Sequence, residues 1–253
     1  MYNPYSLENK TILVTGASSG IGKATAIECS KLGASVVITA RNELRLKEVF
    51  DSLDTSFGQT HKMIIADVST HSAIEELVSQ LPPLDGVSSN AGTVVGNKPI
   101  KFLNDEEVHS LIEVNSLSHL SLLRLLFKKK ILNKGASCVL TSSIGGNFSF
   151  TPGNAIYGMS KAALKAFSRY AAIEFAPRMV RCNCVCPGMI ETPMINSGVL
   201  TDEDNAKHID MYLSKRYGNP KEVALTTAFL LSDAASFING TQIIIDGGYS
   251  INH

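Results

Sequence analysis

A short apolar run that passes directly into a glycine-rich turn constrains this chain most. Thr11–Thr15, TILVT, is followed at once by GASSGIG and then by the helix-like segment KATAIECSKLG. Strand, tight turn and helix in this order predict the first unit of a parallel α/β sheet. Gly16, Gly20 and Gly22 lack side chains, so backbone N–H groups and a helix N-terminus can approach a pyrophosphate. The alternative is a merely tight strand-to-helix turn.

Further apolar runs alternate with helix-length segments along the rest of the chain. With 253 residues, 44% of them apolar, the chain can bury one large core. We therefore expect a single-domain α/β fold over 1–253: a Rossmann-like, doubly wound, seven-stranded parallel sheet, with a dinucleotide-binding part over about 10–142 and a catalytic and substrate part over about 143–253. The expected strands after the first are Ala34–Ala40, Met63–Ala66, Leu84–Ser89, Ala136–Leu140, Arg181–Cys186 and Gln242–Ile245.

A phenol and an ammonium stand four residues apart in NAIYGMSKAALKAF, an Ala-rich segment that predicts a helix. Positions i and i+4 share a helix face, so Tyr157 and Lys161 can meet. A nearby cation favours the phenolate, and lowering a phenol pKa by about three units needs roughly 4 kcal/mol of differential interaction. A tyrosine tuned in this way can exchange a proton with a carbonyl or alcohol oxygen. The alternative is a packed tyrosine beside a solvated lysine.

Two more polar residues occupy positions that suggest a site. Ser143 lies in TSSIGG, just after the apolar run that ends at Leu140. A serine at the carboxyl end of a parallel strand faces the crevice where ligands bind. Asn115 lies among apolar residues in IEVNSLSHLSLLRLL, so we expect it to be buried and hydrogen-bonded. It either belongs to a structural network or holds a catalytic water.

The residues after the second strand bear on the choice of cofactor. NAD-binding units usually end this strand with an acid that holds the ribose 2′-OH, whereas an arginine accommodates a 2′-phosphate. Here Ala40 fills that position and Arg41 follows. We therefore expect NADP(H), with Ser19 as a minor phosphate contact, and keep NAD(H) as the alternative. Arg41 could instead be an exposed first-turn arginine above Glu43 or Glu48.

The ends of the third and fourth strands are suited to an adenosine. The carboxylate of Asp67 can accept from an adenine amino group while Val68 packs on the ring, although Asp67 could instead cap the helix that begins near Thr70. After the fourth strand, the segment formed by Asn90, Ala91 and Gly92 is small enough to let a cofactor pass close to the backbone.

Composition argues against several other classes of protein. Lys plus Arg and Asp plus Glu are 23 each, so the net charge predicts no nucleic-acid and no membrane partner. The N-terminal MYNPYSLENK is unlike a secretory signal, and we expect a soluble, cytoplasmic chain with five reduced cysteines. Cys182, Cys184 and Cys186 alternate, about 6.6 Å apart along a strand, which is too far for one zinc ion. We expect strand packing and no metal site.

Seven motifs occur in a telling order: TGASSGIG, NAG, Asn115, Ser143, YGMSK, CPGMIETPM and DGG. Each is weak alone, but together they resemble the classical short-chain dehydrogenase/reductase family from Thr11 to Gly248. The resemblance implies an oxidoreductase that acts on CH–OH groups with NAD(P) as acceptor. The tail from Arg216 onwards is similar to that of 3-oxoacyl-acyl-carrier-protein reductases and related sugar and alcohol dehydrogenases.

The resemblance also implies residue roles. Tyr157 would exchange the proton with the substrate oxygen, Ser143 would hydrogen-bond that oxygen, and Lys161 would lower the phenol pKa and bind the nicotinamide ribose. Asn115 would hold the water that links Lys161 to solvent. Tyr157 and Lys161 would also contact the cofactor. The other implied cofactor contacts are Gly16, Ser18, Gly20, Ile21 and Gly22 at the pyrophosphate, Asp67 and Val68 at the adenine, Asn90, Ala91 and Gly92 on the ribose side, and Pro187, Gly188, Ile190 and Thr192 at the nicotinamide.

The chain departs from the family pattern at three places. Ser143 lies one residue farther from Tyr157 than usual; we place the extra residue in the loop Asn147–Pro152 and keep Ser142 as the alternative for the serine role. Ser89 stands where many relatives have an asparagine, and Phe237 stands where an aromatic with a hydroxyl is commoner. We expect these last two changes to have little effect.

The segment between Thr192 and Tyr217 reads as irregular, and the resemblance implies that it closes over the substrate. An apolar inner surface is expected from Met194, Ile195, Val199, Leu200, Met211 and Leu213. Such a surface admits many substrates. We expect NADPH-preferring reduction of a ketone, with a 3-oxoacyl thioester as one candidate, or the reverse oxidation of a secondary alcohol. The alternatives are an NAD-dependent alcohol or sugar dehydrogenase, and a non-catalytic dinucleotide-binding sensor or scaffold.

The resemblance finally implies partners. It implies a homotetramer with the Tyr157 helix in one interface and the last strand in another. Lys134 and Arg178 fall near the basic residues with which 3-oxoacyl reductases dock acyl carrier protein, although ordinary solvation also explains two surface cations. The small-molecule partner would be a carbonyl or alcohol substrate.

Overall fold

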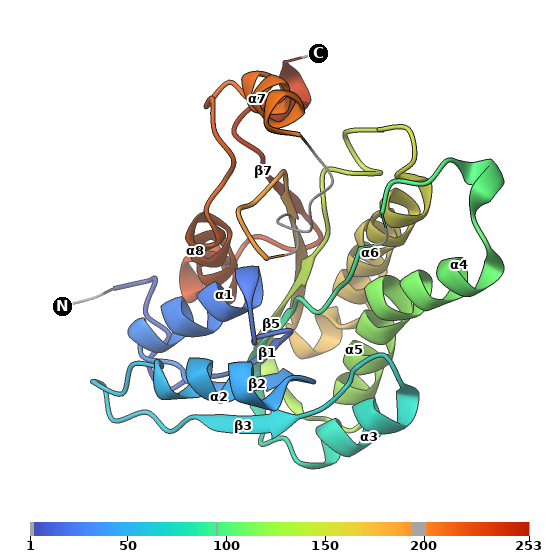
Figure 1. The fold of residues 1–253 in the computed structure, drawn as a ribbon. Helices are drawn as coiled ribbons and strands as arrows, with labels where there is room; N and C mark the ends of the chain where they lie inside the picture. The colour runs from blue at the N-terminus through green and yellow to red at the C-terminus, as the bar shows by residue number, and fades with distance from the viewer. Residues whose placement is uncertain (1–2, 95, 194–200, 253) are drawn as a thin grey trace.

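A parallel sheet forms the centre of the molecule. The computed structural model describes residues 3–94, 96–193 and 201–252, and its seven strands run in the order β3-β2-β1-β4-β5-β6-β7 (Figure 1). The chain winds outward from β1 in one direction and from β4 in the other, which confirms the doubly wound, Rossmann-like α/β fold. The strands are β1 Thr11–Thr15, β2 Ser35–Ala40, β3 Lys62–Ile65, β4 Leu84–Ser89, β5 Leu132–Thr141, β6 Arg181–Pro187 and β7 Gln242–Ile245.

Most strand boundaries match the apolar runs, but β5 does not. It begins at Leu132, earlier than the predicted Ala136. Leu132 pairs with Leu84, and the register then shifts before Gly86 pairs with Ser137. The exposed Lys134 and a glycine with φ of 83° at position 135 fill this irregularity. Polar, turn-like residues inside a paired strand hide its beginning from an apolar pattern.

Helices cover both faces of the sheet and enclose two apolar clusters (Figure 1). On one face lie α1 Gly20–Lys31, α2 Glu43–Asp51 and α8 Pro220–Leu231. On the other lie α3 His71–Ser79, α4 Asp105–Ile112, α5 Ser118–Lys128 and α6 Ala155–Glu174. A π-helical turn, η2 Glu113–Leu117, joins α4 to α5, and the short helices are η1 Ile100–Phe102, η3 Ala176–Arg178, η4 Asp233–Ala235 and η5 Tyr249–Ile251.

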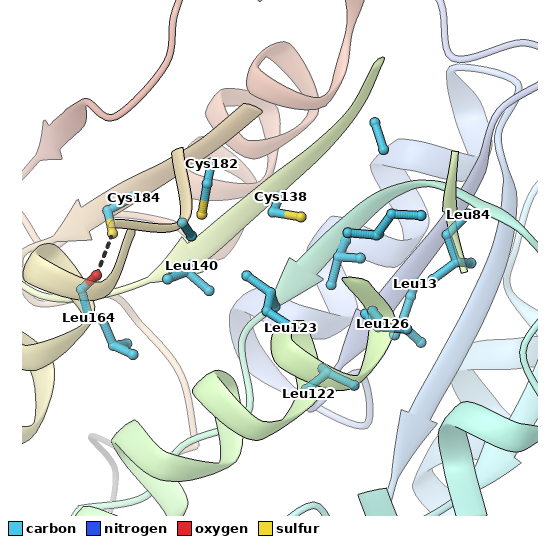
Figure 2. Close-up of a cluster of buried hydrophobic side chains, with 14 of the residues drawn as sticks. Leu13, Leu84, Leu122, Leu123, Leu126, Cys138, Leu140, Leu164, Cys182 and Cys184 are labelled. Carbon is cyan, nitrogen blue, oxygen red and sulfur yellow. Dashed lines mark hydrogen bonds between the residues drawn. The ribbon is translucent and has the colours of Figure 1, made fainter. Parts of the chain in front are cut away.

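The cysteines of the central strands belong to the core beneath α5 and α6. Cys138, Cys182 and Cys184 lie among leucines such as Leu140 and Leu123 (Figure 2). All five cysteines are buried free thiols, and burial raises the pKa of Cys138 and Cys184 to about 12. Their packing role is therefore confirmed. Among the residues that the structure describes, no group of three or more His, Cys, Asp or Glu side chains is arranged to hold a metal ion.

The segment expected to be irregular contains a helix. Thr201 caps α7, Asp202–Asp210, by accepting from the backbone N–H of Asp204, and the helix lies beside the C-terminal segment (Figure 1). The expectation failed because α7 is mostly polar, and an exposed polar helix shows no apolar period. Met211 and Leu213 are 38% and 55% exposed. The other residues assigned to the inner surface, Met194, Ile195, Val199 and Leu200, lie outside the described residues.

Within residues 3–94, 96–193 and 201–252, every helix is too short or too polar to span a bilayer.

Candidate active site

Ser143 and Tyr157 come together at the carboxyl end of β5. Ser143 follows that strand, and Tyr157 stands in the first turn of α6. Their side chains share a hydrogen bond, and the Ser143 Oγ also accepts from the Gly145 N–H at 3.0 Å. Both side chains are half-buried. The structure thus brings the predicted hydroxyl pair into contact.

The phenol of Tyr157 titrates in the opposite direction to the prediction. Burial raises the pKa of Tyr157 above 10.0, and the hydrogen bond with Ser143 only partly opposes this effect. The expected lowering by Lys161 is absent: its ammonium donates to the Thr141 carbonyl at 3.0 Å, and Ser143 rather than Lys161 opposes the effect of burial on the phenol. At neutral pH the phenol is therefore protonated and able to donate.

Lys161 lies one helical turn beyond Tyr157 and is almost fully buried, with 5% of its surface exposed. Burial lowers the pKa of its amine from 10.5 to about 8. A Cβ on Gly92 would lie 3.1 Å from Lys161 Nζ and 3.3 Å from Asn115 Oδ1. Lys161 and Asn115 therefore border the same small space, next to the segment after β4.

Asn115 is fully buried in the π-helical turn η2. Its Oδ1 accepts from the Thr93 N–H at 2.8 Å, and its Nδ2 donates to the Thr93 carbonyl at 2.9 Å and to Ser160 Oγ at 3.2 Å. The prediction of a buried, hydrogen-bonded asparagine is confirmed. These hydrogen bonds hold the segment that follows β4 against α6. The π-helical turn that carries Asn115 directs its side chain into the interior.

Ser142 and Ser143 have different surroundings. Ser142 is 3% exposed, and its hydroxyl donates to the Lys161 carbonyl at 2.7 Å. Asn147 donates from Nδ2 to Ser142 Oγ at 3.2 Å and to the Ser143 carbonyl at 2.9 Å. Ser142 is thus bound to the backbone of α6, which leaves Ser143 facing Tyr157.

Residues 144–149, at the start of the loop to which we assigned the extra residue, fold into a compact turn. Gly146 donates to the Ser149 carbonyl at 2.9 Å, and Phe148 donates to the Ile144 carbonyl at 2.8 Å. Gly146, with φ of 76°, packs directly on Gly158 of α6: a Cβ on Gly146 would collide with the Gly158 carbonyl, and a Cβ on Gly158 would lie 3.1 Å from Gly146 Cα. The additional residue is therefore absorbed by the loop without separating Ser143 from Tyr157.

At the glycine turn after β1, backbone groups rather than side chains are available to a ligand. Gly16 has φ of 65°, and a Cβ there would lie 2.9 Å from Ala91 Cα. Ser19 is the N-cap of α1, but its side chain caps no N–H. The first-turn N–H groups of α1, which include those of Ile21 and Gly22, therefore have no side-chain cap. Such a helix start suits a pyrophosphate, and Ser18 is half-buried beside it.

The segment after β6 returns to this turn. A Cβ on Gly20 would lie 3.1 Å from Thr192 Cγ2. Gly188 donates to the Ile245 carbonyl at 2.9 Å, and Ile190 is 5% exposed and pairs with Gly218. Pro187 is buried at the end of β6. The residues expected at the nicotinamide thus lie beside the glycine turn and the end of β7, and their contact with a nicotinamide stays a prediction.

Arg41 directly follows the carboxyl end of β2. It precedes Asn42, whose side chain caps α2, so Arg41 is not a first-turn arginine as the alternative supposed. The side chain is exposed and forms no ion pair with the residues that the structure describes. It lines a pocket of about 300 Å³ together with Asp67 and Ala66. A cation without a carboxylate partner is suited to an anionic group.

Asp67 is exposed and does not cap a helix. Its carboxylate accepts from the Ser69 N–H at 3.0 Å, whereas α3 is capped by Thr70. Val68 packs against the apolar core instead of standing free. The capping alternative for Asp67 is therefore wrong, and the adenine assignment stays a prediction.

Sequence reasoning missed two residues beside the site. Asn147 holds the backbone of Ser143, and His119 on α5 contacts both Ser89 and Ala91. A polar residue in a loop or on an apolar helix face gives no periodic signal. The position of Ser89, noted as a departure, was the available clue to His119.

The arrangement has a definite chemical capacity. A protonated phenol and the hydroxyl of Ser143 lie together near a buried amine, and Arg41 lines a separate pocket with Asp67. Such a set can hold a carbonyl or alcohol oxygen and exchange its proton. The glycine turn, Gly92 and Arg41 fit a phosphorylated dinucleotide in length and polarity.

Comparison with known proteins agrees with this geometry. Residues 16–250 match the family model described as enoyl-(acyl carrier protein) reductase. The chain is 35% identical to the 3-oxoacyl-[acyl-carrier-protein] reductase FabG of Rickettsia felis, over 96% of this chain and 97% of that protein. It is 27% identical to the rat (Rattus norvegicus) dehydrogenase/reductase SDR family member 6, over 97% and 99% of the two chains.

Solved structures give the same result. Levodione reductase superposes with a TM-score of 0.89 at 29% identity, over 97% of this chain and 99% of that chain. A candidate NAD(P)-dependent gluconate 5-dehydrogenase from Beutenbergia cavernae, with NADP bound at low occupancy, superposes with a TM-score of 0.86 at 27% identity, over 98% and 99%.

Proposed function

The chain belongs to the short-chain dehydrogenase/reductase family, whose members are oxidoreductases of CH–OH groups with NAD(P), and from this premise we propose that it reduces a ketone with NADPH. The reverse oxidation of a secondary alcohol uses the same groups. The observation that carries the proposal is the hydrogen-bonded pair Ser143 and Tyr157 above the buried amine of Lys161. A sensor or scaffold that only binds a dinucleotide needs no such pair.

The residues divide the chemistry between them. When bound, a nicotinamide dinucleotide supplies the hydride for the substrate carbon. Ser143 donates a hydrogen bond to the substrate oxygen, and Tyr157 transfers its phenolic proton to that oxygen as the alcohol forms. The raised pKa of Tyr157 keeps the proton in place until charge develops on the oxygen. Lys161 and Asn115 border Gly92 together, where Lys161 would bind the nicotinamide ribose.

The preference for NADPH rests on Arg41. It directly follows Ala40, which fills the position where an acid would select the ribose 2′-OH; it is exposed, and it lines the pocket that also contains Asp67. A guanidinium at this place suits a 2′-phosphate. The NADP bound to the Beutenbergia structure supports a phosphate-bearing cofactor in a related protein.

Two substrate classes have support from relatives. The FabG proteins favour a 3-oxoacyl thioester, whereas the gluconate dehydrogenase fold neighbour favours a sugar or polyol. We favour the thioester because the 3-oxoacyl reductase of Rickettsia felis is 35% identical to this chain, whereas the gluconate dehydrogenase neighbour is 27% identical.

A carrier protein and a homotetramer belong to the same proposal. Lys134 is exposed at the start of β5, and Arg178 ends η3 just before β6, so both lie at the amino ends of the strands. A carrier docked there could serve only the site of another subunit. Exposed apolar residues support two interfaces: Tyr170 and Ile173 on α6, at 66% and 71%, and Phe237 near β7, which is fully exposed. Light scattering of the purified protein tests the tetramer, and a monomer contradicts it.

The decisive experiment is a substrate panel read with both reduced cofactors. Purified protein is incubated with NADPH or NADH and with 3-oxoacyl thioesters, simple ketones or keto sugars, and cofactor absorbance is followed. We expect turnover of a thioester with NADPH. Keto-sugar turnover with NADH supports the alternative dehydrogenase. Folded protein that binds the cofactor but turns over no substrate on the panel contradicts the enzyme and favours the sensor.

A further inference from the structure

A buried histidine links α5 to the strand end that borders the catalytic lysine. His119 is 1% exposed. Its Nδ1 lies 2.7 Å from Ser89 Oγ, and its Nε2 lies 2.8 Å from the Ala91 carbonyl oxygen. No role assigned above uses this side chain.

The two contacts determine the form of the imidazole. A carbonyl oxygen only accepts, so Nε2 carries the proton and donates to Ala91. Nδ1 is then unprotonated and accepts from the Ser89 hydroxyl. Burial, together with the charge of Lys161, lowers the pKa of His119 to about 3. The ring is therefore neutral at physiological pH and acts as a fixed donor and acceptor.

The proposed function places the cofactor beside the segment Asn90–Gly92, which His119 holds and which borders Lys161. Thr15 Oγ1 accepts from Asn90 and Ala91 N–H groups at 2.9 and 3.2 Å, which anchors the segment to β1. His119 anchors the Ala91 carbonyl from the other side. Gly92 follows directly and borders Lys161 Nζ. A rotation of the Ala91 peptide would therefore move Gly92 relative to the lysine.

We propose that His119 is a positioning residue for the dinucleotide: oriented by Ser89, it fixes the Ala91 peptide and so shapes the cofactor wall formed by Asn90–Gly92. The inference rests on the proposed dinucleotide-dependent function. It also gives Ser89 a purpose, because a hydroxyl can donate to Nδ1 and thereby select the Nε2–H tautomer. A histidine that merely fills space would be replaceable by any side chain of similar volume.

Cofactor titration with a matched set of variants tests the proposal. NADPH fluorescence gives Kd for the wild type, His119→Gln and His119→Leu, with thermal unfolding measured in parallel. Leucine keeps much of the volume but has no donor, so we expect Kd to rise about tenfold. Glutamine can donate to Ala91 and should recover most of the affinity. His109→Leu, on the exposed side of α4, is the control and should leave Kd unchanged.

A second measurement does not depend on the cofactor. ¹⁵N NMR of the histidine rings should show His119 neutral and protonated at Nε2 between pH 5 and 8. Ser89→Ala should increase the Nδ1–H tautomer and raise Kd less than His119→Leu does. If His119→Leu does not fold, the tautomer and Ser89→Ala decide the question.

Three outcomes separate the proposals. Wild type that binds NADPH while His119→Leu binds equally well overturns the positioning role alone. A wild-type ring protonated at Nδ1 also overturns it. Wild type that binds neither NADPH nor NADH overturns the proposed function instead.

Discussion

The region of the predicted catalytic residues and the region predicted to bind the adenosine are held in place in different ways. At the catalytic end, Ser142, Asn147 and Lys161 are tied to backbone atoms or to one another, and most of their surface is buried. At the adenosine end, Arg41 and Asp67 are exposed and make few contacts. Buried, hydrogen-bonded groups have one arrangement, whereas exposed groups can change without disturbing the core. In the proposed function, the proton-transfer groups would be fixed by packing, whereas Arg41 would set the cofactor preference from an exposed position.

The largest effect expected from this comparison is on turnover. Tyr157→Phe removes the proton donor, so kcat should fall by about a thousandfold or more while NADPH binding persists. Steady-state kinetics and cofactor titration measure the two separately. Tyr5→Phe, at an exposed tyrosine of the N-terminal segment, is the control. Retention of a tenth of the wild-type kcat would remove Tyr157 from the reaction.

The buried amine gives a prediction about stability. The pKa of Lys161 falls from 10.5 to about 8 on folding, so between about pH 8 and 10.5 the unfolded chain binds more protons than the folded chain. The contribution of Lys161 to stability therefore rises with pH in that window. Urea unfolding should show the free-energy difference, wild type minus Lys161→Met, increasing by about 2 kcal/mol from pH 7 to pH 9.5. A difference independent of pH contradicts the burial argument.

Asn147 tests whether the catalytic end depends on its internal bonds. Asn147→Ala removes the donor to Ser142 and to the Ser143 carbonyl. We expect a loss of about 1–2 kcal/mol in the free energy of unfolding and about a tenfold lower kcat. Asn97→Ala, at an exposed position in the neighbouring segment, should change neither quantity. Wild-type kcat in Asn147→Ala would show that Ser143 is held by other means.

The smallest expected effect lies at the adenosine end. Arg41→Ala should raise the Kd for NADPH about fivefold to tenfold, leave the Kd for NADH nearly unchanged, and alter the melting temperature little. Arg45→Ala, in the first turn of α2, is the matched control because it removes the same charge nearby. An equal loss of affinity for both cofactors means that Arg41 does not contact the 2′-phosphate.

The same contrast explains what the sequence could predict. Strand β1 matched its apolar run because a buried parallel strand has a continuous apolar signal. The start of β5 and the polar helix α7 have no such signal. The pKa of Tyr157 was predicted in the wrong direction because a helix spacing of four residues reports proximity to Lys161 but not burial. Asn147 and His119 could not be predicted from the sequence, because hydrogen bonds to main-chain oxygens leave no periodic pattern.

The contact between Gly146 and Gly158 has a practical consequence for redesign. This contact holds the loop against α6 at a point that precedes residues 149–152 in the chain. Helix α6 begins at Ala155. We expect insertions or deletions between Gly146 and Ala155 to leave Tyr157 in its position. Loop grafts at this stretch are therefore a route to new substrate ranges that spares the reaction centre.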